Sequence, residues 1–364
     1  MTVAVVVGTR PELIKMAPVL FALEDSKMET ILIHTGQHYD ENLSAQFLTE
    51  LGIRQPDYHL EVGSDSQARQ AAECMMRLEA VFDEVRPKCM LVEGDTNTVL
   101  AGALTAAKMG ITVGHVEAGL RSMDRRMPEE YNRRVADHIS HLLFAPTRHA
   151  AKTLRGEKVW GKIYITGNTV IDACERYAPI SEHRSGVIRK IPFDEFILVT
   201  AHRAENVDDP GVLASLVRVL TSAPLPIVYP IHPRTQKRLR EMDLYTKLAK
   251  AKRVHLLPPV GYFDMLALLR RCAFILTDSG GIQEEATAPS IRKRVLVFRE
   301  NTERPEAVEA GYARVVGTDA KNVSKALLEE WQHPAKPCAP SPYGDGKGGE
   351  RIARIVAKCK GMKR

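Results

Sequence analysis

Two acidic residues lie near the ends of short apolar runs, where a carboxylate could take up or return a proton. Asp95 follows Met90–Val92 in the stretch EGDTNT. Glu117 follows Thr112–Val116 in GHVEAGLR. Asp95 could also cap the next helix, which is its simpler role on this stretch alone. Glu117 lies one step beyond an apolar strand, an odd place for a merely solvating carboxylate, so we expect a functional role for it.

A second pair of acids, Glu129 and Glu130, follows Pro128 in MPEEYNR. Acidic side chains in the first turn of a helix are stabilised by the helix dipole, whatever the function. The helix dipole is a sufficient explanation for Glu130, and it applies to Glu129 as well.

Two basic side chains near a strand-to-helix turn could hold an anion. The stretch GTRPELIK follows the run Val3–Val7, with Gly8 suited to the turn and Pro11 to the first helical turn. Arg10 and Lys15 would then stand near a helix N-terminus, which favours phosphate groups. An ordinary turn with two surface cations fits equally well. The missing GxGxxG pattern disfavours a nicotinamide-dependent dehydrogenase.

Two histidines in the second half of the chain each follow an apolar run. His202 lies beside Arg203 in TAHRAEN, and His232 follows Tyr229–Ile231. A lone histidine is often structural, but a strand end that faces a cleft favours a functional role for His202. For His232 the structural and functional roles fit equally well.

A glycine-rich turn, TDSGGIQEE, also follows an apolar run. Ser279 can cap a helix there, and Gly280 and Gly281 would let a ligand approach the backbone at the helix start. This geometry predicts a site for a pyrophosphate. Glycine-rich turns also occur without ligands, and Arg304 in the downstream stretch NTERPE strengthens the prediction.

The elements that position these side chains form two similar series. In each half, short apolar β-branched runs alternate with stretches of helical period, which predicts βαβ units and parallel, doubly wound sheets. The expected strands are Val3–Val7, Thr30–His34, Met90–Glu93, Thr112–Val116, Leu142–Ala145 and Ile163–Thr166, then Phe196–Thr200, Pro226–Pro230, Val254–Leu257, Ala273–Thr277, Val295–Phe298 and Ala313–Val316.

A polar segment with several helix-breaking residues, 179–192, separates the two series. We therefore predict an α/β protein with two Rossmann-like domains that face a central cleft. The domains are expected over residues 1–178 and 179–349, and a C-terminal helix over 350–364 is expected to cross back to the first domain. Ligands of such sheets bind beyond the carboxyl ends of the strands, so the cleft is the expected site.

Composition argues against several classes of protein. The net charge of +6 has its one local excess in the tail, where a solvated helix end explains it, and no nucleic-acid-binding motif is present. No apolar run approaches the roughly 18 residues of a membrane span. The six cysteines lack CxxC spacing, and a chain this long needs no disulfides. We expect a cytoplasmic protein with reduced thiols and no nucleic-acid or membrane partner.

Together the five stretches closely resemble the non-hydrolysing UDP-N-acetylglucosamine 2-epimerase family. The match runs over essentially the whole chain and includes SPYGDG near its end. The order and spacing of five long motifs make the resemblance far more specific than any one of them. It implies a pair of Rossmann domains of the glycosyltransferase-B type, a homodimer, and catalysis without metal or redox cofactor.

The resemblance also implies the site residues. The catalytic group would comprise three acid/base carboxylates and a histidine at the diphosphate: Asp95, Glu117, Glu129 and His202. The sugar-nucleotide, phosphate and ribose contacts would come from Arg10, Lys15, Ser279, Gly280, Gly281, Glu285 and Arg304. To these we add His232 as a binding residue because of its place after an apolar run.

The implied reaction is the reversible inversion of C2 that interconverts UDP-N-acetylglucosamine and UDP-N-acetylmannosamine. This C2 has no neighbouring carbonyl, so loss of its proton cannot give an enolate. Elimination of UDP to 2-acetamidoglucal, followed by re-addition, is a workable route.

Alternative activities stay open. Relatives that act on UDP-2,3-diacetamido sugar uronates carry nearly the same motifs. A UDP-sugar glycosyltransferase of the same fold would not need the three carboxylates, and a catalytically dead binding protein would not keep every competent side chain.

One stretch departs from the family pattern. Some bacterial members bind a second UDP-N-acetylglucosamine as activator, partly through a Gln-His-Arg stretch. Here Gln37 and His38 are followed by Tyr39 and Asp40. The charge of Asp40 would repel a diphosphate, which predicts an enzyme that does not need this activator.

Overall fold

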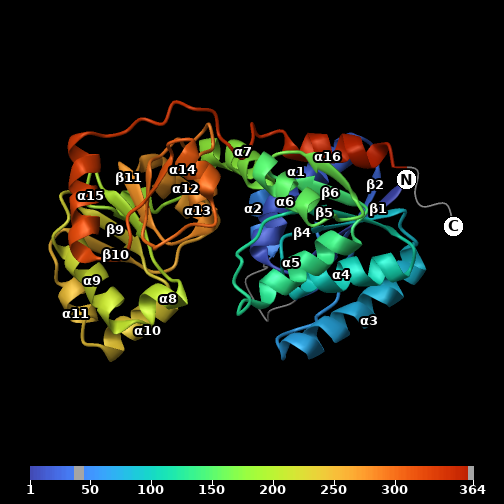
Figure 1. Cartoon of the computed structure of the whole chain (residues 1–364), viewed down its shortest axis with the longest axis horizontal. Helices are drawn as coiled ribbons and strands as arrows, with labels where there is room; N and C mark the ends of the chain where they lie inside the picture. The colour runs from blue at the N-terminus through green and yellow to red at the C-terminus, as the bar shows by residue number, and fades with distance from the viewer. Residues whose placement is uncertain (37–44, 360–364) are drawn as a thin grey trace. The chain divides into compact units, whose positions relative to one another are not determined.

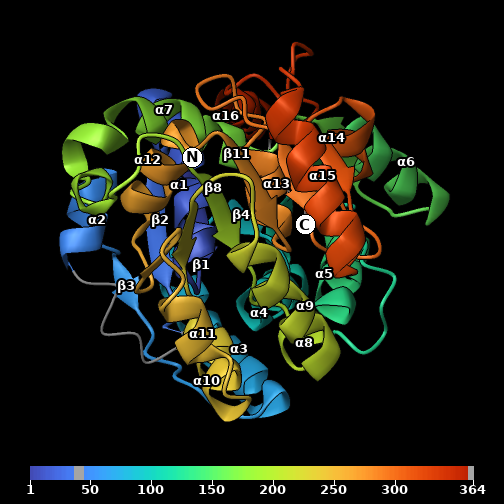
Figure 2. The same ribbon diagram turned by 90° about the vertical axis from the view of Figure 1, so that its left-hand side faces the viewer.

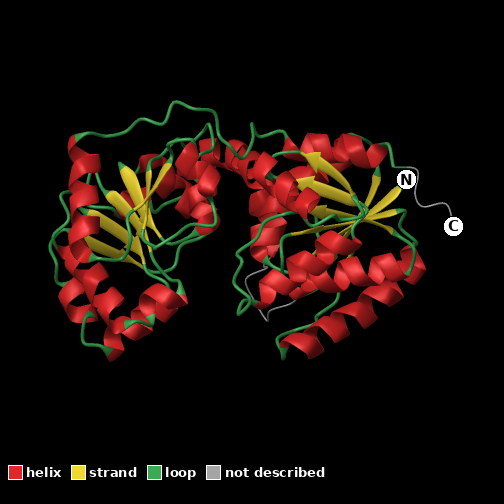
Figure 3. Cartoon of the chain, viewed as in Figure 1, coloured by secondary structure: helices red, strands yellow, loops and turns green. Residues whose placement is uncertain are grey.

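The chain forms two compact units, which are described one at a time. The computed structural model describes residues 1–36 and 45–359, so the stretch Gln37–Asp40 lies outside the described residues. One unit is Met1–Ala173 with Tyr343–Arg364, and the other is Cys174–Pro342. Each is a parallel sheet covered by helices (Figure 3). The predicted class, α/β with two Rossmann-like domains, is confirmed, whereas the domain boundaries at 178 and 349 stay predictions.

The described part of the first unit contains a seven-stranded sheet in the order β3-β2-β1-β4-β5-β6-β7 (Figure 1). Its strands are β1 (Thr2–Val7), β2 (Glu29–His34), β3 (Tyr58–His59), β4 (Cys89–Glu93), β5 (Thr112–Val116), β6 (Leu142–Ala145) and β7 (Lys162–Ile165). Its helices are α1 (Arg10–Asp25), α2 (Ala45–Leu51), α3 (Gln67–Val85), α4 (Asn97–Lys108), α5 (Pro128–Ile139), α6 (Arg148–Gly156) and α16 (Gly348–Ala357), and α7 (Thr169–Arg184) leads into the second unit.

The second unit contains a six-stranded sheet in the order β10-β9-β8-β11-β12-β13. Its strands are β8 (Ile197–Thr200), β9 (Ile227–Pro230), β10 (Val254–Leu257), β11 (Phe274–Thr277), β12 (Val295–Val297) and β13 (Ala313–Val315). Its helices are η1 (Ile188–Lys190), α8 (Ala204–Val207), α9 (Pro210–Thr221), α10 (Pro233–Glu241), α11 (Tyr245–Ala249), α12 (Tyr262–Arg271), α13 (Gly280–Glu285), α14 (Pro305–Glu309) and α15 (Ala320–Gln332).

The apolar runs of the sequence form the interior strands of both sheets. Val3–Val7 is fully buried in β1, as expected for a parallel strand with helices on both faces. All twelve expected strands are present within a residue or two of their predicted bounds, and only β3 was not anticipated. Two residues are too few to show a strand period. Pro179 lies inside α7 and does not end this helix, although the helix-breaking residues of segment 179–192 suggested a break there.

Both sheets reverse their strand order once, between β1 and β4 in the first unit and between β8 and β11 in the second. Figure 2 shows β8 and β11 side by side. In open α/β sheets ligands bind outside the carboxyl ends of the strands at such a reversal. The residues that leave β1, β4, β8 and β11 therefore occupy the expected binding positions.

None of the helices in the described ranges combines the length and apolar character of a bilayer-spanning segment. All six cysteines are free, and four of them are buried. Burial raises the pKa of the Cys74 and Cys272 thiols to about 12, so both stay protonated near neutral pH.

The C-terminal helix α16 returns to the first unit and packs against α1, as the sequence predicted (Figure 1). The two helices approach closely at Gly349, where a Cβ atom would lie only 2.6 Å from the backbone oxygen of Pro18. The backbone N–H of Gly349 donates a 2.7 Å hydrogen bond to Asp172 on α7. Glycine is therefore required here by the close approach of two backbones.

A buried carboxyl closes the turn between β1 and α1. Glu12 accepts hydrogen bonds of 2.8 Å from the backbone N–H of Gly8 and 3.0 Å from the hydroxyl of Thr9. Burial raises the pKa of Glu12 to about 7, although these hydrogen bonds act in the opposite direction. Glu12 therefore holds a proton in the folded chain under mildly acidic conditions.

We expect Gly349→Ala to destabilise the chain by about 1–3 kcal/mol, because the added methyl group meets backbone atoms that cannot turn aside. Gly156→Ala, at the end of α6, is the matched control, since nothing lies within 4 Å of the position that its added Cβ atom would occupy. Urea unfolding of both variants measures the difference. Equal stabilities would show that α16 does not depend on this close approach.

We expect Glu12→Gln to change how stability depends on pH. Because the folded-state pKa of about 7 exceeds the ordinary 4.5, the folded chain binds more protons than the unfolded chain between these values. The contribution of Glu12 is fully present below pH 4.5 and is lost as the pH rises through 7. The wild type should lose about 3 kcal/mol relative to the variant over this range, measured by urea unfolding. Parallel pH profiles would contradict the assignment.

Candidate functional site

Glu117 follows β5 in a backbone conformation that few side chains adopt. Its φ is 67°, in the left-handed region that costs a non-glycine residue about 1–2 kcal/mol. Its Oε2 atom lies 2.6 Å from Nζ of Lys15 on α1 and accepts a 3.1 Å hydrogen bond from the amide of Asn168. The structure thus brings two predicted site residues, Lys15 and Glu117, into direct contact.

Lys15 also contacts a second carboxyl group. Its Nζ atom lies 2.9 Å from Oε1 of Glu93, the buried last residue of β4. Burial raises the pKa of Glu93 well above its ordinary value, Lys15 opposes this, and repulsion from Glu117 adds to it. One ammonium group therefore serves two carboxyl groups, and the arrangement favours a proton on Glu93.

Asp95 follows β4 and is tied to α5. Its carboxylate pairs with the guanidinium of Arg133, and its backbone oxygen accepts a 3.0 Å hydrogen bond from the Asn132 amide. The N-cap of α4 is Thr96, so Asp95 does not play the capping role that the sequence also allowed. The sequence analysis missed Arg133, although its position four residues after Glu129 places both on one helix face.

The adjacent acids of α5 have different environments. Glu130 is buried and accepts hydrogen bonds of 2.9 and 3.0 Å from the backbone and hydroxyl of Ser122, and one of 3.0 Å from Arg134. Burial opposes ionisation, but these hydrogen bonds lower the pKa of Glu130. Glu129 is partly exposed, and its side chain makes no hydrogen bond or ion pair with another described residue. Glu130 therefore holds the loop before α5, and Glu129 is the one available to a ligand.

A buried charge network lies behind these carboxylates. Nδ1 of His115 lies 2.8 Å from Oδ1 of Asp137, and its Nε2 lies 2.8 Å from the backbone oxygen of Gly94. Both ring nitrogens face acceptors, which requires a proton on each. Burial opposes this charge, but Asp137 raises the pKa of His115 overall.

The partner carboxylate extends the same network. Asp137 also accepts from the backbone N–H of Gly119 at 3.2 Å and pairs with Arg121 at 2.7 Å. The network joins the turn before Asp95, the turn after Glu117 and helix α5. Sequence reasoning missed both His115 and Asp137. Asp137 lies four residues after Arg133, and that helical spacing was the available signal.

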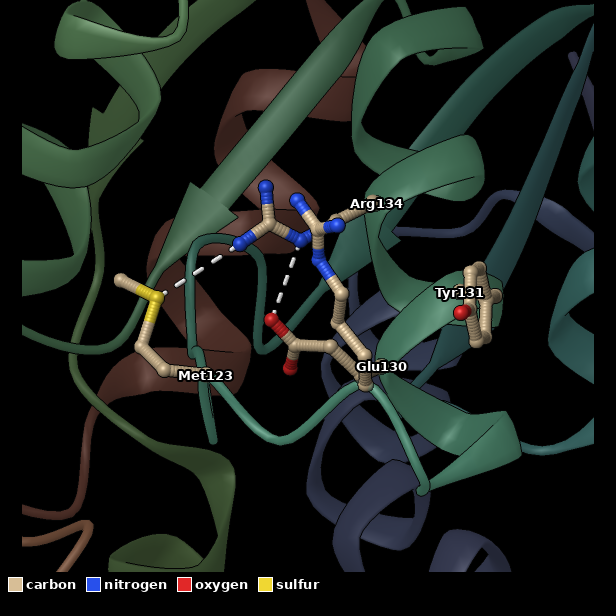
Figure 4. Close-up of a pocket in the computed structure, with 5 residues that line it drawn as sticks. Met123, Glu130, Tyr131 and Arg134 are labelled. Atoms are coloured by element: carbon tan, nitrogen blue, oxygen red, sulfur yellow. Dashed lines mark hydrogen bonds and ion pairs between the residues drawn. The ribbon is translucent and has the colours of Figure 1, made fainter.

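Arg10 and a surface cavity are two further features of the first unit. The Arg10 guanidinium lies over the ring of Phe47, 4.2 Å from its centre. A cavity of about 450 Å³ lies beside α5, lined by Met123, Arg125, Glu130, Tyr131 and Arg134 (Figure 4). None of the predicted site residues lines it, so it is not the site that the sequence predicted.

His202 and His232 of the second unit lie together at the carboxyl ends of β8 and β9. Their ring centres are 5.6 Å apart. Nδ1 of His232 accepts a 3.2 Å hydrogen bond from the backbone N–H of Arg234 and caps α10. Burial, His202 and Arg234 lower the pKa of His232, which favours its neutral form. The buried Asp278, after β11, accepts the backbone N–H of His202 at 2.9 Å.

The predicted phosphate turn begins α13. Ser279 is its N-cap, with its hydroxyl oxygen 3.5 Å from the donating N–H of Ile282. The Arg304 guanidinium lies over Gly280, 3.6 Å from where a Cβ atom would be, and pairs with the buried Glu284. Gly281, the next residue of α13, has only the Ser279 hydroxyl near its Cβ position, at 3.9 Å. The turn therefore combines a helix start with a fixed guanidinium, a combination suited to an anion.

Glu285, on α13, lies near two buried groups. After burial itself, it is the main charge that raises the pKa of the Cys174 thiol, and it also raises that of the Tyr262 hydroxyl. Within residues 1–36 and 45–359, no three His, Cys, Asp or Glu side chains are grouped as metal ligands. The first unit thus offers acid/base groups and cations, and the second offers an anion site.

Known proteins resemble this chain over nearly its full length. A family model described as UDP-N-acetylglucosamine 2-epimerase matches residues 22–357. A protein of Methanocaldococcus jannaschii named UDP-N-acetylglucosamine 2-epimerase is 42% identical, with 98% of this chain and 99% of the relative covered. A Pseudomonas aeruginosa relative named UDP-2,3-diacetamido-2,3-dideoxy-D-glucuronate 2-epimerase is 36% identical over 98% of this chain and all of the relative.

Solved structures give the same result. The Methanocaldococcus jannaschii UDP-GlcNAc 2-epimerase in complex with UDP-GlcNAc and UDP has a TM-score of 0.86, at 42% identity, covering 98% of this chain and 99% of that one. The Neisseria meningitidis enzyme bound to UDP-GlcNAc also has a TM-score of 0.86, at 35% identity, covering 98% and 100%. The full-length match in sequence and fold, with the motif residues at the strand ends, establishes that this chain belongs to the UDP-N-acetylglucosamine 2-epimerase family.

Proposed function

We propose that this enzyme interconverts UDP-N-acetylglucosamine and UDP-N-acetylmannosamine by inversion at C2. The main support is that the first unit has carboxylates at the ends of adjacent strands. Glu117 is held by Lys15, and Asp95 is held by Arg133. Inversion needs one group that removes a proton and one that returns it to the other face of the sugar. A glycosyltransferase of the same fold has no such need.

The reaction proceeds by elimination and re-addition. A carboxylate removes the C2 proton, the C–H electron pair forms the C1–C2 double bond, and the C1–O pair leaves with UDP. The product pair is 2-acetamidoglucal and UDP. UDP then adds back at C1 while C2 is protonated on its opposite face. Asp95, Glu117 and Glu129 are the proposed acid/base groups.

The second unit binds the nucleotide. Departure of UDP places negative charge on its diphosphate, and preorganised donors and cations stabilise such charge. His202, the Ser279–Gly281 turn and Arg304 supply them, with His232 beside His202. Glu285 is the proposed ribose ligand, and Arg10 the further cation of the first unit.

A second candidate substrate is a UDP-2,3-diacetamido sugar uronate, because the Pseudomonas aeruginosa relative named for it is nearly as similar as the others. We favour UDP-N-acetylglucosamine, for which the more similar relatives are named. A cytoplasmic location, a homodimer, a role in cell-surface polysaccharide synthesis and independence of added cofactor stay predictions.

Elimination predicts solvent exchange at C2. In heavy water the enzyme should yield UDP-N-acetylmannosamine that carries deuterium at C2, because the carboxylate exchanges its proton with solvent before the return step. Proton NMR of the product measures this. Retention of the original hydrogen would favour internal hydride return instead.

A parallel assay with the diacetamido uronate should give a lower kcat/KM, and a higher value would reassign the substrate.

Amide substitutions test the carboxylates. Asp95→Asn, Glu117→Gln and Glu129→Gln should each lower turnover roughly 10²-fold or more, because each removes an acid or base and keeps its shape. Glu79→Gln, an exposed acid on α3, should leave turnover unchanged.

The neighbouring pair Glu129 and Glu130 provides the sharpest comparison. Glu129→Gln should reduce turnover without changing the melting temperature. Glu130→Gln should lower the melting temperature, because a buried carboxylate loses its hydrogen bonds. Near-normal turnover of Glu129→Gln would remove Glu129 from the catalytic group.

A further inference from the structure

Asp278 lies directly beneath the loop that carries His202. It follows β11 and is fully buried, and β11 pairs with β8 so that Thr277 lies opposite Thr200. One carboxylate oxygen, Oδ2, accepts the backbone N–H groups of His202 at 2.9 Å and Arg203 at 2.8 Å. The same oxygen accepts the amide of Asn206 at 3.1 Å. These donors fix both the orientation of the carboxylate and the path of the loop.

The other carboxylate oxygen of Asp278 faces the His202 ring. Oδ1 is buried and accepts no hydrogen bond from another described residue. It lies 3.4 Å from Nδ1 of His202. A buried acceptor without a donor is costly, and catalytic hydrogen bonds are often long before substrate binds. An N–H at Nδ1 of His202 would satisfy this oxygen.

We propose that Asp278 is a positioning residue that holds the Nδ1 proton of His202 and so directs Nε2 of the ring toward its ligand. With Nδ1 protonated, Nε2 can bind a proton and donate it in a charge-assisted hydrogen bond to an anionic oxygen. The neighbouring Oδ1 of Asp278 fixes the Nδ1 side of the ring by accepting that hydrogen bond. The proposal rests on the proposed function for the identity of that anion, the diphosphate of departing UDP.

The neighbouring His232 supplies an internal reference. Its Nδ1 accepts the backbone N–H of Arg234, so its proton must be on Nε2 when the ring is neutral. The two histidines are therefore expected to be opposite tautomers within one site.

Asp278→Asn is a sharp test because the loop dictates how the new amide is oriented. The three N–H donors at Oδ2 require an oxygen there, so the amide nitrogen must face Nδ1 of His202. Because that nitrogen donates a hydrogen bond, Nδ1 of His202 must accept it. The proton of the neutral ring would therefore be on Nε2. Asp319→Asn is the matched control, since it removes a carboxylate charge from the N-cap of α15, where Asn caps equally well.

The experiment is ¹⁵N NMR of the histidine side chains of the full chain, at a pH where the rings are neutral and without substrate. Wild-type His202 should carry its proton on Nδ1 and His232 on Nε2. Asp278→Asn should move the His202 proton to Nε2 and leave the His232 tautomer unchanged. Asp319→Asn should give the same tautomers as the wild type at both histidines. A wild-type His202 with its proton on Nε2 would overturn the proposal even if the variant does not fold.

Turnover supplies the second measurement. Asp278→Asn should lower turnover of UDP-N-acetylglucosamine roughly 10- to 100-fold, and no further loss should follow in a His202→Ala background, because Asp278 acts through His202. An undiminished second loss in that background would overturn the positioning role. An inactive wild type with the expected tautomers would contradict the proposed function and leave the assignment of Asp278 intact.

Discussion

Parallel strands in one sheet place all their carboxyl ends along the same edge, and the site of this protein depends on that constraint. In the first sheet β1, β4 and β5 are consecutive neighbours, so the residues that follow them must lie close together. The contact of Lys15 with both Glu93 and Glu117 is a direct result. In the second sheet the pairing of β8 with β11 has the same effect on His202 and Asp278.

Burial then divides the charged residues into two kinds. Charges removed from water must be paired or hydrogen-bonded, and His115, Asp137 and Glu130 are buried with such partners. These groups hold turns and helices in place. Asp95 and Glu129 keep access to solvent. Asp95 pairs with Arg133, which also pairs with the buried Glu130, and Glu129 is the chain neighbour of Glu130. The carboxylates proposed as acid/base groups thus lie on turns and helices that are held in place by buried, paired charges.

The backbone conformation at Glu117 also depends on contacts from neighbouring elements. A left-handed glutamate is unfavourable alone, and the surrounding contacts must outweigh that cost. Lys15 holds its side chain, while Asp137 holds the N–H of Gly119 two residues later. The conformation therefore depends on α1 and α5 together, which links the position of this carboxylate to the packing of both helices.

The sequence by itself determined the strands, the fold class, the crossing helix and the motif residues, because apolar periodicity and turn chemistry are local properties. It did not determine which of two adjacent acids is buried, and only the family resemblance, not the local pattern, separated Glu129 from Glu130. Helical spacing placed Arg133 and Asp137 on one face of α5, but it did not show which groups they would pair with. His115 and Asp278 had no such signal. Their roles depend on strand order and on partners distant in the chain, such as Gly94 for His115 and His202 for Asp278. Only the tertiary structure decides those contacts, because the role of a buried charge depends on which groups surround it and hydrogen-bond to it.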